Sequence, residues 1–456
     1  TAVGYQAGYS NTTGQQSVFV GYQAGYLVTG SYNHAFGYGA MSGGATTGTQ
    51  NTAIARFALN SLTSGSNNVG VGDSSLQNTT SGGNNVAVGF NALLSNTTAS
   101  YNTAVGYQAA YTNSTGTYLT AIGYQAGYSS TGNQNTYVGY IAGKPDVGSA
   151  NTFIGYASGN GVGGGSQNGS HNTGIGNQTS LNLSSGSYNT ALGSQSLLNN
   201  TTASNNTAVG YQAGYSNTTG GTVDAFGYQA AYSNTTGVAL QAFGLQALKN
   251  NTTGGYNCAF GQYALYSNTT ANYNTAVGYQ AAYNSNGQYV TAVGYQSNGS
   301  GSNSGAMLAL GSFALYSNTT GNGNTAVGDY QTMYNNTTGA YNSAFGRQAL
   351  YSNTTASNNT AVGYQSGYSA AVSSGNTFFG AAAGYNHNLG AAGNGYNTFI
   401  GNSAGYYVTT GTKNTILGQY SGNQGGLDIR TANNYIVLSD GDGNPRLFCN
   451  GNADPN

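Results

Sequence analysis

Charged residues are almost missing from this sequence: its 456 residues include seven Lys and Arg, eight Asp and no Glu. An ordinary soluble domain has about a quarter charged residues. The net charge of −1 provides no basic surface for nucleic acid or anionic lipid. No uninterrupted apolar run approaches the ~18 residues of a membrane-spanning helix. We therefore expect neither nucleic-acid binding nor membrane insertion.

Metal ligands and catalytic side chains are equally scarce. The two cysteines, Cys258 and Cys449, are too few and too far apart for a disulfide framework, and with only three His they form no Cys/His metal motif. Trp is absent and Pro occurs three times. We expect no enzymatic activity, no cofactor and no metal. The 76 Gly in a polar chain are compatible with disorder, but the order within the sequence argues against it.

A short motif repeats along almost the whole chain. Its best copy is Asn102-Thr103-Ala104-Val105-Gly106-Tyr107-Gln108-Ala109, and its central Gly recurs, with Ala55 as the one replacement, in 25 copies about 17 residues apart. Each copy ends in a turn such as Ser-Asn-Thr-Thr-Gly, whose Asn and Gly tolerate positive φ. A constant period of this kind is the signature of a solenoid.

The repeat is too short for a helical hairpin and rich in β-branched and aromatic residues, which favours strands. We predict an all-β fold, a parallel β-roll or β-solenoid of about 25 coils, each with two short strands and two turns. Equivalent residues would form ladders along the coil axis, with side-chain hydrogen bonds and stacked rings. Like charges would repel each other in such ladders, which accounts for the missing charge. The expected ladder residues are Asn102, Thr103, Ala104, Val105, Gly106 and Tyr107.

Two neighbouring columns of the strand are apolar, the Ala104 column and the Val105 column. Successive side chains of a strand point to opposite faces. If one column fills the interior of the coil, the other needs a second cover, and a copy of the same chain is the natural candidate. We expect a homo-oligomer, specifically a homotrimer; the alternative is a monomer in which the small Ala side chains lie exposed.

The two ends of the chain differ. The sequence starts inside a repeat, so we expect a fragment. Residues 1–422 are predicted to form the repetitive shaft. Residues 423–456 contain six charged residues, and 435–438 and 446–448 flank the turn Asp440-Gly441-Asp442-Gly443, which predicts a β-hairpin. We expect this transition segment to lead to a further C-terminal region.

The Asn-Thr-Ala-Val-Gly repeats resemble the Ser-Val-Ala-Ile-Gly repeats in the heads of trimeric autotransporter adhesins. This resemblance covers residues 1 to about 422 and implies a left-handed β-roll with three chains around one axis, although the coils of this chain are longer. The tail from Asn434 to Asn444 looks like the segment before the distal region of bacteriophage tail fibres. Tail fibres with Asn-Thr-Ala-Val-Gly-Tyr-Gln-Ala repeats are the most similar family we can name.

Several other patterns permit two interpretations. The Asn-Thr-Thr turns match the N-glycosylation pattern, but turn chemistry accounts for them equally well. The Tyr columns that include Tyr9, Tyr111 and Tyr128 could stack on sugars, whereas stacking between coils is the simpler interpretation. The candidate glycosylation sites are Asn11, Asn96, Asn217, Asn234 and Asn353.

Three further features favour structural roles. The Gly-rich run at 161–165 lacks the Lys and helix of a phosphate-binding loop, so we interpret it as an insertion, like 389–395. The Asp440 turn lacks the register and terminal Glu of a calcium loop. His34, His171 and His387 have no ligand partners at metal-binding spacing and are expected at the surface.

These patterns predict a structural protein, the rigid shaft of a phage tail fibre that positions a host-receptor-binding tip. We expect it in the virion, outside the cell, with itself, other tail-fibre or baseplate proteins and, through the tip, a host surface glycan or protein as partners. The alternative is an adhesin on the bacterial surface whose roll itself binds glycan or matrix. A weaker alternative is ice binding through the Thr column (Thr103, Thr120, Thr136 and Thr152).

Overall fold

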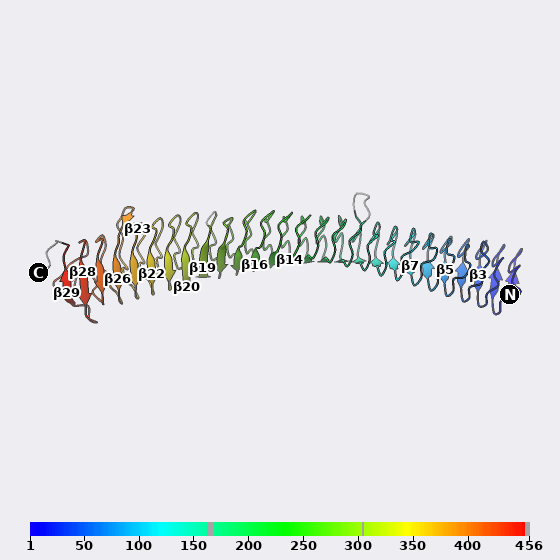
Figure 1. Ribbon diagram of the computed structural model, residues 1–456, viewed down its shortest axis with the longest axis horizontal. Coiled ribbons are helices and arrows are strands. Elements are labelled where there is room, and N and C mark those ends of the chain that lie inside the picture. Colours follow the sequence, from blue (N-terminus) through cyan, green and yellow to red (C-terminus); the bar gives the residue numbers. More distant parts are fainter. Residues whose placement is uncertain (162–166, 303–304, 452–456) are drawn as a thin grey trace. The chain divides into compact units, whose positions relative to one another are not determined.

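The computed structural model describes residues 1–161, 167–302 and 305–451 (Figure 1). The described residues contain strands and turns but no helix. The chain is a parallel β-solenoid of about 25 coils with a repeat of about 17 residues, which confirms the predicted fold class. It divides into two compact units, Thr1–Ala225 and Phe226–Asn456, which are described separately.

The first unit has one short strand in each coil, and its last strand, β14, crosses the boundary. The strands are β1 (Ala2–Val3), β2 (Val18–Val20), β3 (His34–Phe36), β4 (Thr52–Ile54), β5 (Val69–Val71), β6 (Val86–Val88), β7 (Thr103–Val105), β8 (Thr120–Ile122), β9 (Thr136–Val138), β10 (Thr152–Ile154), β11 (Thr173–Ile175), β12 (Thr190–Leu192), β13 (Thr207–Val209) and β14 (Val223–Phe226).

The second unit continues the same pattern and adds a hairpin at its C-terminal end. The strands are β15 (Leu240–Phe243), β16 (Cys258–Phe260), β17 (Thr275–Val277), β18 (Val290–Val293), β19 (Met307–Ser312), β20 (Thr325–Tyr330), β21 (Ser343–Phe345), β22 (Thr360–Val362), β23 (Ser373–Ser374), β24 (Thr377–Phe379), β25 (Gly393–Asn394), β26 (Thr398–Ile400), β27 (Thr415–Leu417), β28 (Ile436–Ser439) and β29 (Pro445–Cys449).

The strands pair in parallel and in strict register, so that equivalent residues lie side by side. Thr103 pairs with Thr120, and Ala104 with Ala121. The glycine that follows each strand is required by this stacking. At Gly106 φ is 138°, and a Cβ there would overlap the carbonyl of Gly123 in the next coil. The ladder predicted for residues 102–107 is therefore the one observed in the first unit.

The prediction of two strands per coil is wrong. The wall opposite the strands consists of turns in which residues of positive and negative φ alternate, for example Gln108 and Ala110, both at φ 53°. Because of this alternation, the backbone N–H groups of the wall point in turn to the preceding coil and to the following coil. Gln108 N–H donates to Phe90 O of the preceding coil and Ala110 N–H to Ala126 O of the following coil, both at 2.9 Å. The wall is thus hydrogen-bonded between coils without being a β-sheet.

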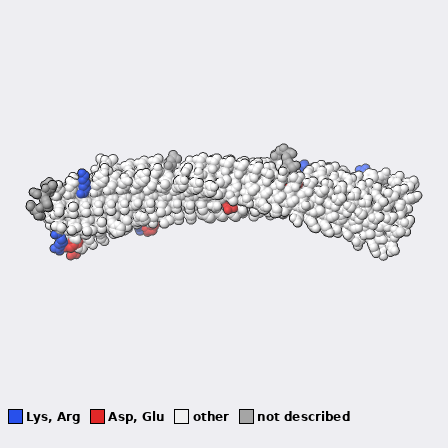
Figure 2. All heavy atoms as spheres, viewed as in Figure 1, with Lys and Arg blue, Asp and Glu red and all other residues white. Residues whose placement is uncertain are grey.

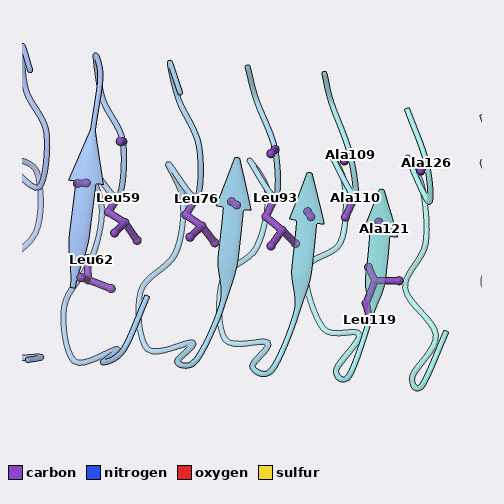
Figure 3. Packing of buried hydrophobic residues seen from close by; sticks show 14 of the residues in the cluster. Leu59, Leu62, Leu76, Leu93, Ala109, Ala110, Leu119, Ala121 and Ala126 are labelled. Carbon is purple, nitrogen blue, oxygen red and sulfur yellow. The ribbon is translucent and has the colours of Figure 1, made fainter. Parts of the chain in front are cut away.

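A narrow core lies between the strands and the opposite wall. The central residue of each three-residue strand, such as Ala104 or Ala121, is buried. Figure 3 shows Leu59, Leu76 and Leu93 in a row, one in each successive coil, filling the space beside the strands. Since only a few small apolar side chains per coil make up this core, for example Ala53, Ala58, Leu59 and Leu62, its stability depends on the size match within each coil.

The C-terminal end differs partly from the expectation. β28 pairs antiparallel with β29, which is the expected hairpin. β28 also pairs in parallel with β27, Ile416 beside Val437, so the parallel stack extends one strand beyond residue 422. Of the two insertions, 389–395 contributes β25, which pairs in parallel with β23. Most of the Gly-rich insertion, residues 162–165, lies outside the described residues.

Candidate functional surfaces

Buried asparagines hold the coils together at the start of each strand. Asn102 is fully buried, and its backbone N–H donates to Asn85 Oδ1 at 3.0 Å. Its Oδ1 accepts the N–H of Leu119 at 2.9 Å, and its Nδ2 donates to Gly116 O at 3.0 Å. The side chain therefore replaces backbone hydrogen bonds where the chain enters the strand. Loss of such a group leaves buried donors and acceptors unpaired.

A second asparagine column, seven residues after the strand glycine, contains the candidate glycosylation sites. Asn96, Asn217, Asn234 and Asn353 are fully buried, and each Nδ2 donates to the carbonyl three residues later at 2.8–3.2 Å. Asn11, in the first coil, is half-buried, and its Oδ1 accepts the N–H of Gly14. The interpretation as glycan carriers is wrong for the four buried sites, because their amide nitrogens are used inside the folded coil.

The outer face of the strands carries one polar and one apolar column. In β7, Thr103 and Val105 point outward while Ala104 points into the core. The apolar column that contains Val105 is well exposed in both units: Ile54 is 40 % exposed, Leu192 44 %, Phe345 41 % and Leu417 48 %. Contiguous apolar surface of this kind marks interaction sites. The outward neighbour of the Thr column is thus this apolar column and not Ala.

Two tyrosine columns follow the strand glycine in each unit, and a third, with Tyr101 and Tyr118 in the first unit and Tyr256 and Tyr273 in the second, precedes the strand. The first follows the strand glycine and includes Tyr107 and Tyr124, whose ring centroids are 5.2 Å apart at an interplanar angle of 6°. The second lies four residues later and includes Tyr111 and Tyr128, with centroids 5.0 Å apart. The stacking predicted between coils is therefore present. Within an intact column both faces of each ring are covered, so sugars cannot stack there.

The few charged residues lie mostly at the surface and next to an aromatic ring or an opposite charge. Figure 2 shows how little of the visible face they occupy. Arg56 pairs with Asp73 at 2.9 Å, and Arg430 with Asp428 at 2.7 Å. Lys144 Nζ lies 5.4 Å from the ring centroid of Tyr128, and Lys249 Nζ 5.7 Å from that of Tyr266, in cation–π geometry. Both lysines stand in the second tyrosine column, where they cover a ring that has lost its neighbour.

One carboxyl group is buried in the first unit. Asp146 takes the place of an asparagine in the second asparagine column, accepts the Tyr137 hydroxyl at 2.7 Å and the Asn151 Nδ2 at 2.9 Å. Its other oxygen accepts the N–H of Gly148 at 2.8 Å. Burial raises the pKa of Asp146 to about 7, although these hydrogen bonds oppose the shift.

His387 occupies the same column in the second unit and is also buried, so the expectation of a surface role is wrong for this histidine. Its Nε2 lies 2.7 Å from Ser373 Oγ, and its ring meets those of Phe378 and Phe399 edge-on. Burial lowers its pKa to about 4. His171, by contrast, stacks on Tyr188 with centroids 4.9 Å apart. Sequence reasoning could have placed His387 inside the coil, because it stands at an asparagine position of the repeat.

Other candidate features have structural roles. Asp440 accepts hydrogen bonds from the backbone of Asn444 and the side chain of Arg446, and these contacts lower its pKa. Within the described ranges, no group of three or more His, Cys, Asp or Glu could hold a metal ion. Cys258 lies at the Thr position of β16, beside Thr275. No helix that could cross a membrane is found in the described part of the chain.

Comparison with known proteins gives no family. No family model, curated protein or solved structure matches this chain. Its function must therefore be argued from the coil itself.

Proposed function

We propose that this chain is a structural fibre protein, the rigid shaft of a phage tail fibre that positions a host-receptor-binding tip. One observation carries the proposal: buried asparagines at the strand starts hydrogen-bond each coil to its neighbours, as Asn102 does to Asn85 and Leu119. Each coil thus serves as the template for its neighbour, and few residues are left over for chemistry. A segment of this kind resists bending and keeps its two ends apart.

The exposed apolar column supports a homotrimer as the working form of the shaft. This column contains Val, Ile, Leu and Phe and recurs in almost every coil of both units. Its period is that of the solenoid, so a second copy of this chain matches it coil for coil, whereas an irregular partner surface does not. The flanking Thr column is mostly half-buried and carries one acidic residue, Asp224 in β14, so two such faces approach with little desolvation of charged groups.

The virion assignment is tested by electron microscopy. An antibody raised against residues 1–422 is applied to particles of the phage that encodes the chain, and an antibody against its major capsid protein serves as control. We expect gold labels along fibres that project from the tail. Labels on the host cell envelope and none on the particles would refute the assignment and favour a cell-surface adhesin.

A further inference from the structure

The second tyrosine column has one position without a side chain. Tyr266, Tyr283, Tyr316 and Tyr334 belong to this column, and Gly299 stands between Tyr283 and Tyr316. The backbone ladder is intact there: Asn284 N–H donates to Gly299 O at 3.3 Å, and Ser300 N–H to Tyr316 O at 2.8 Å. Only a ring is missing, so the neighbouring rings each lose a stacking partner.

The gap is an open cavity of about 230 Å³ that both rings line. Tyr283 stacks on Tyr266 on its other side, with centroids 5.0 Å apart, and Tyr316 on Tyr334 at 5.3 Å. At the interruptions Lys144 and Lys249, a lysine side chain covers the ring next to it. Gly299 has no side chain to do so, and one face of Tyr283 and one of Tyr316 remain toward the cavity.

The polar lining of the cavity is neutral. Gln280 and Gln296 form an amide pair in which Gln296 Nε2 donates to Gln280 Oε1, and Asn284 and Ser300 complete the lining. This pair is isolated, because Tyr263 and Phe313 take the equivalent positions in the coils on either side. Within the described residues, no hydrogen bond uses Gln280 Nε2 or Gln296 Oε1. One donor and one acceptor are thus available beside two aromatic faces.

We propose that the gap at Gly299 is a binding slot for one neutral hexopyranose ring of a glycan. Aromatic faces contact the C–H face of a sugar, and side-chain amides exchange hydrogen bonds with its hydroxyl groups. The backbones that carry Tyr283 and Tyr316 lie two coils apart, about 10 Å from strand spacing, and the Tyr316 ring leans into part of this space. A flat aromatic ring placed between two tyrosine rings fills a gap of two carbon–carbon contact distances, about 7–8 Å. The puckered ring of a hexopyranose is thicker and fills a wider gap. The cavity is smaller than the ~300 Å³ of the smallest drug-sized pockets, which limits the slot to a single ring.

The substitution Gly299→Tyr tests the slot, because it supplies the missing ring. Tyr316 leans over Gly299, with Cε2 3.0 Å from the position of an added Cβ, and must move back into its column. Lys249→Tyr is the matched control: it completes the same column at a distant coil and leaves the slot unchanged. Thermal unfolding of both variants checks that the coils are intact.

Binding is measured by saturation-transfer NMR with the methyl glycosides of glucose, galactose, mannose and N-acetylglucosamine, and with p-cresol as a flat aromatic probe. We expect at least one sugar to bind with a millimolar dissociation constant, G299Y to weaken it at least tenfold, and K249Y to leave it unchanged. Should G299Y unfold, Y283A must produce the same loss.

Three results would overturn the slot: no binding by any of the four sugars, sugar binding that survives both G299Y and Y283A, or binding of p-cresol alone. The slot rests on the geometry of the coils around Gly299. Its failure would leave the fibre proposal untouched, and failure of the fibre proposal would leave the slot untouched.

Discussion

Gly25 and Phe19 share one site in the core: a Cβ on Gly25 would overlap the ring of Phe19. The two residues lie six positions apart in the same coil, one in the opposite wall and one in β2. The same match recurs in four other coils whose inward strand residue is aromatic, and in several coils where that residue is Ala the glycine is replaced by Leu, as in Ala87 and Leu93. The large residues and their glycines are Tyr137 with Gly143, Phe153 with Gly159, Phe378 with Gly384 and Phe399 with Gly405.

This relationship predicts a compensating double substitution. G25M alone overfills the coil and should cost about 1–3 kcal/mol of unfolding free energy, and F19A alone about 3–5 kcal/mol. The double variant F19A/G25M reproduces the pair Ala35 and Met41 of the next coil and should be more stable than F19A. Urea unfolding of the four proteins measures this coupling. Strictly additive losses would contradict a shared site.

The buried asparagine column predicts a large cost for a small change. N102A removes the two hydrogen bonds of the side chain: the buried N–H of Leu119 loses its acceptor, and the carbonyl of Gly116 keeps only Asn113 Nδ2 as a donor. We expect a loss of about 1–3 kcal/mol for each buried group left unpaired. The control is T98A at a nearby exposed position, which should change stability by less than about 0.5 kcal/mol. Equal effects of the two substitutions in urea unfolding would refute this role of the column.

Because the carboxyl group of Asp146 is buried, we expect the first unit to lose stability as the pH rises. Its pKa of about 7 in the folded chain exceeds the ordinary value of 3.8, so the folded state holds the proton more tightly. The contribution of protonated Asp146 to the free energy of unfolding is fully present below pH 4. It is lost as the pH rises to about 7, and each unit of pKa difference between the folded and unfolded states corresponds to about 1.4 kcal/mol. D146N restores the asparagine of the column and should remove this dependence. Hydrogen exchange of the coils around Asp146 at pH 5 and pH 8 measures it, with coils near Asn217 as the internal reference.

Because the imidazole ring of His387 is buried, we expect the stability of the second unit to depend on pH in the opposite direction. Its folded pKa of about 4 lies below the ordinary value of 6.5, so the unfolded state binds the proton more tightly. The second unit should therefore lose stability as the pH falls from about 6.5 to 4. H387N, which restores the asparagine of the column, should abolish the loss. The readout is hydrogen exchange of β24 and β26 at both pH values; an unchanged pH profile in H387N would show that another group titrates.

The exposed apolar column predicts how the proposed trimer dissociates. I122K places a charge on this column, where Ile122 is 40 % exposed in the single chain, and should reduce the mass in sedimentation equilibrium to that of one chain, 46.1 kDa. Y118K, at a side chain that is 57 % exposed and outside the strand, is the control and should leave the mass at three chains. A wild-type protein that sediments at 46.1 kDa would refute the trimer.

Much of this architecture can be predicted from the sequence. The spacing of the Gly-centred motif gave the parallel solenoid, the register and the stacked tyrosines, because a strict period leaves equivalent residues no arrangement other than columns. The interior position of the second asparagine column was not predicted. Its Asn-Thr-Thr pattern is typical of surface turns, and only the closed coil turns those side chains inward.

The sequence by itself determined the columns, since the identity of each repeated position is a local property of the chain. The tertiary structure decided which columns face the core and which face solvent, because that depends on the path of the opposite wall. Alternating positive and negative φ in that wall, as at Gln108 and Ala110, makes it a turn ladder instead of a second strand. The same wall places Tyr283 and Tyr316 on either side of Gly299 and so converts one missing side chain into a cavity.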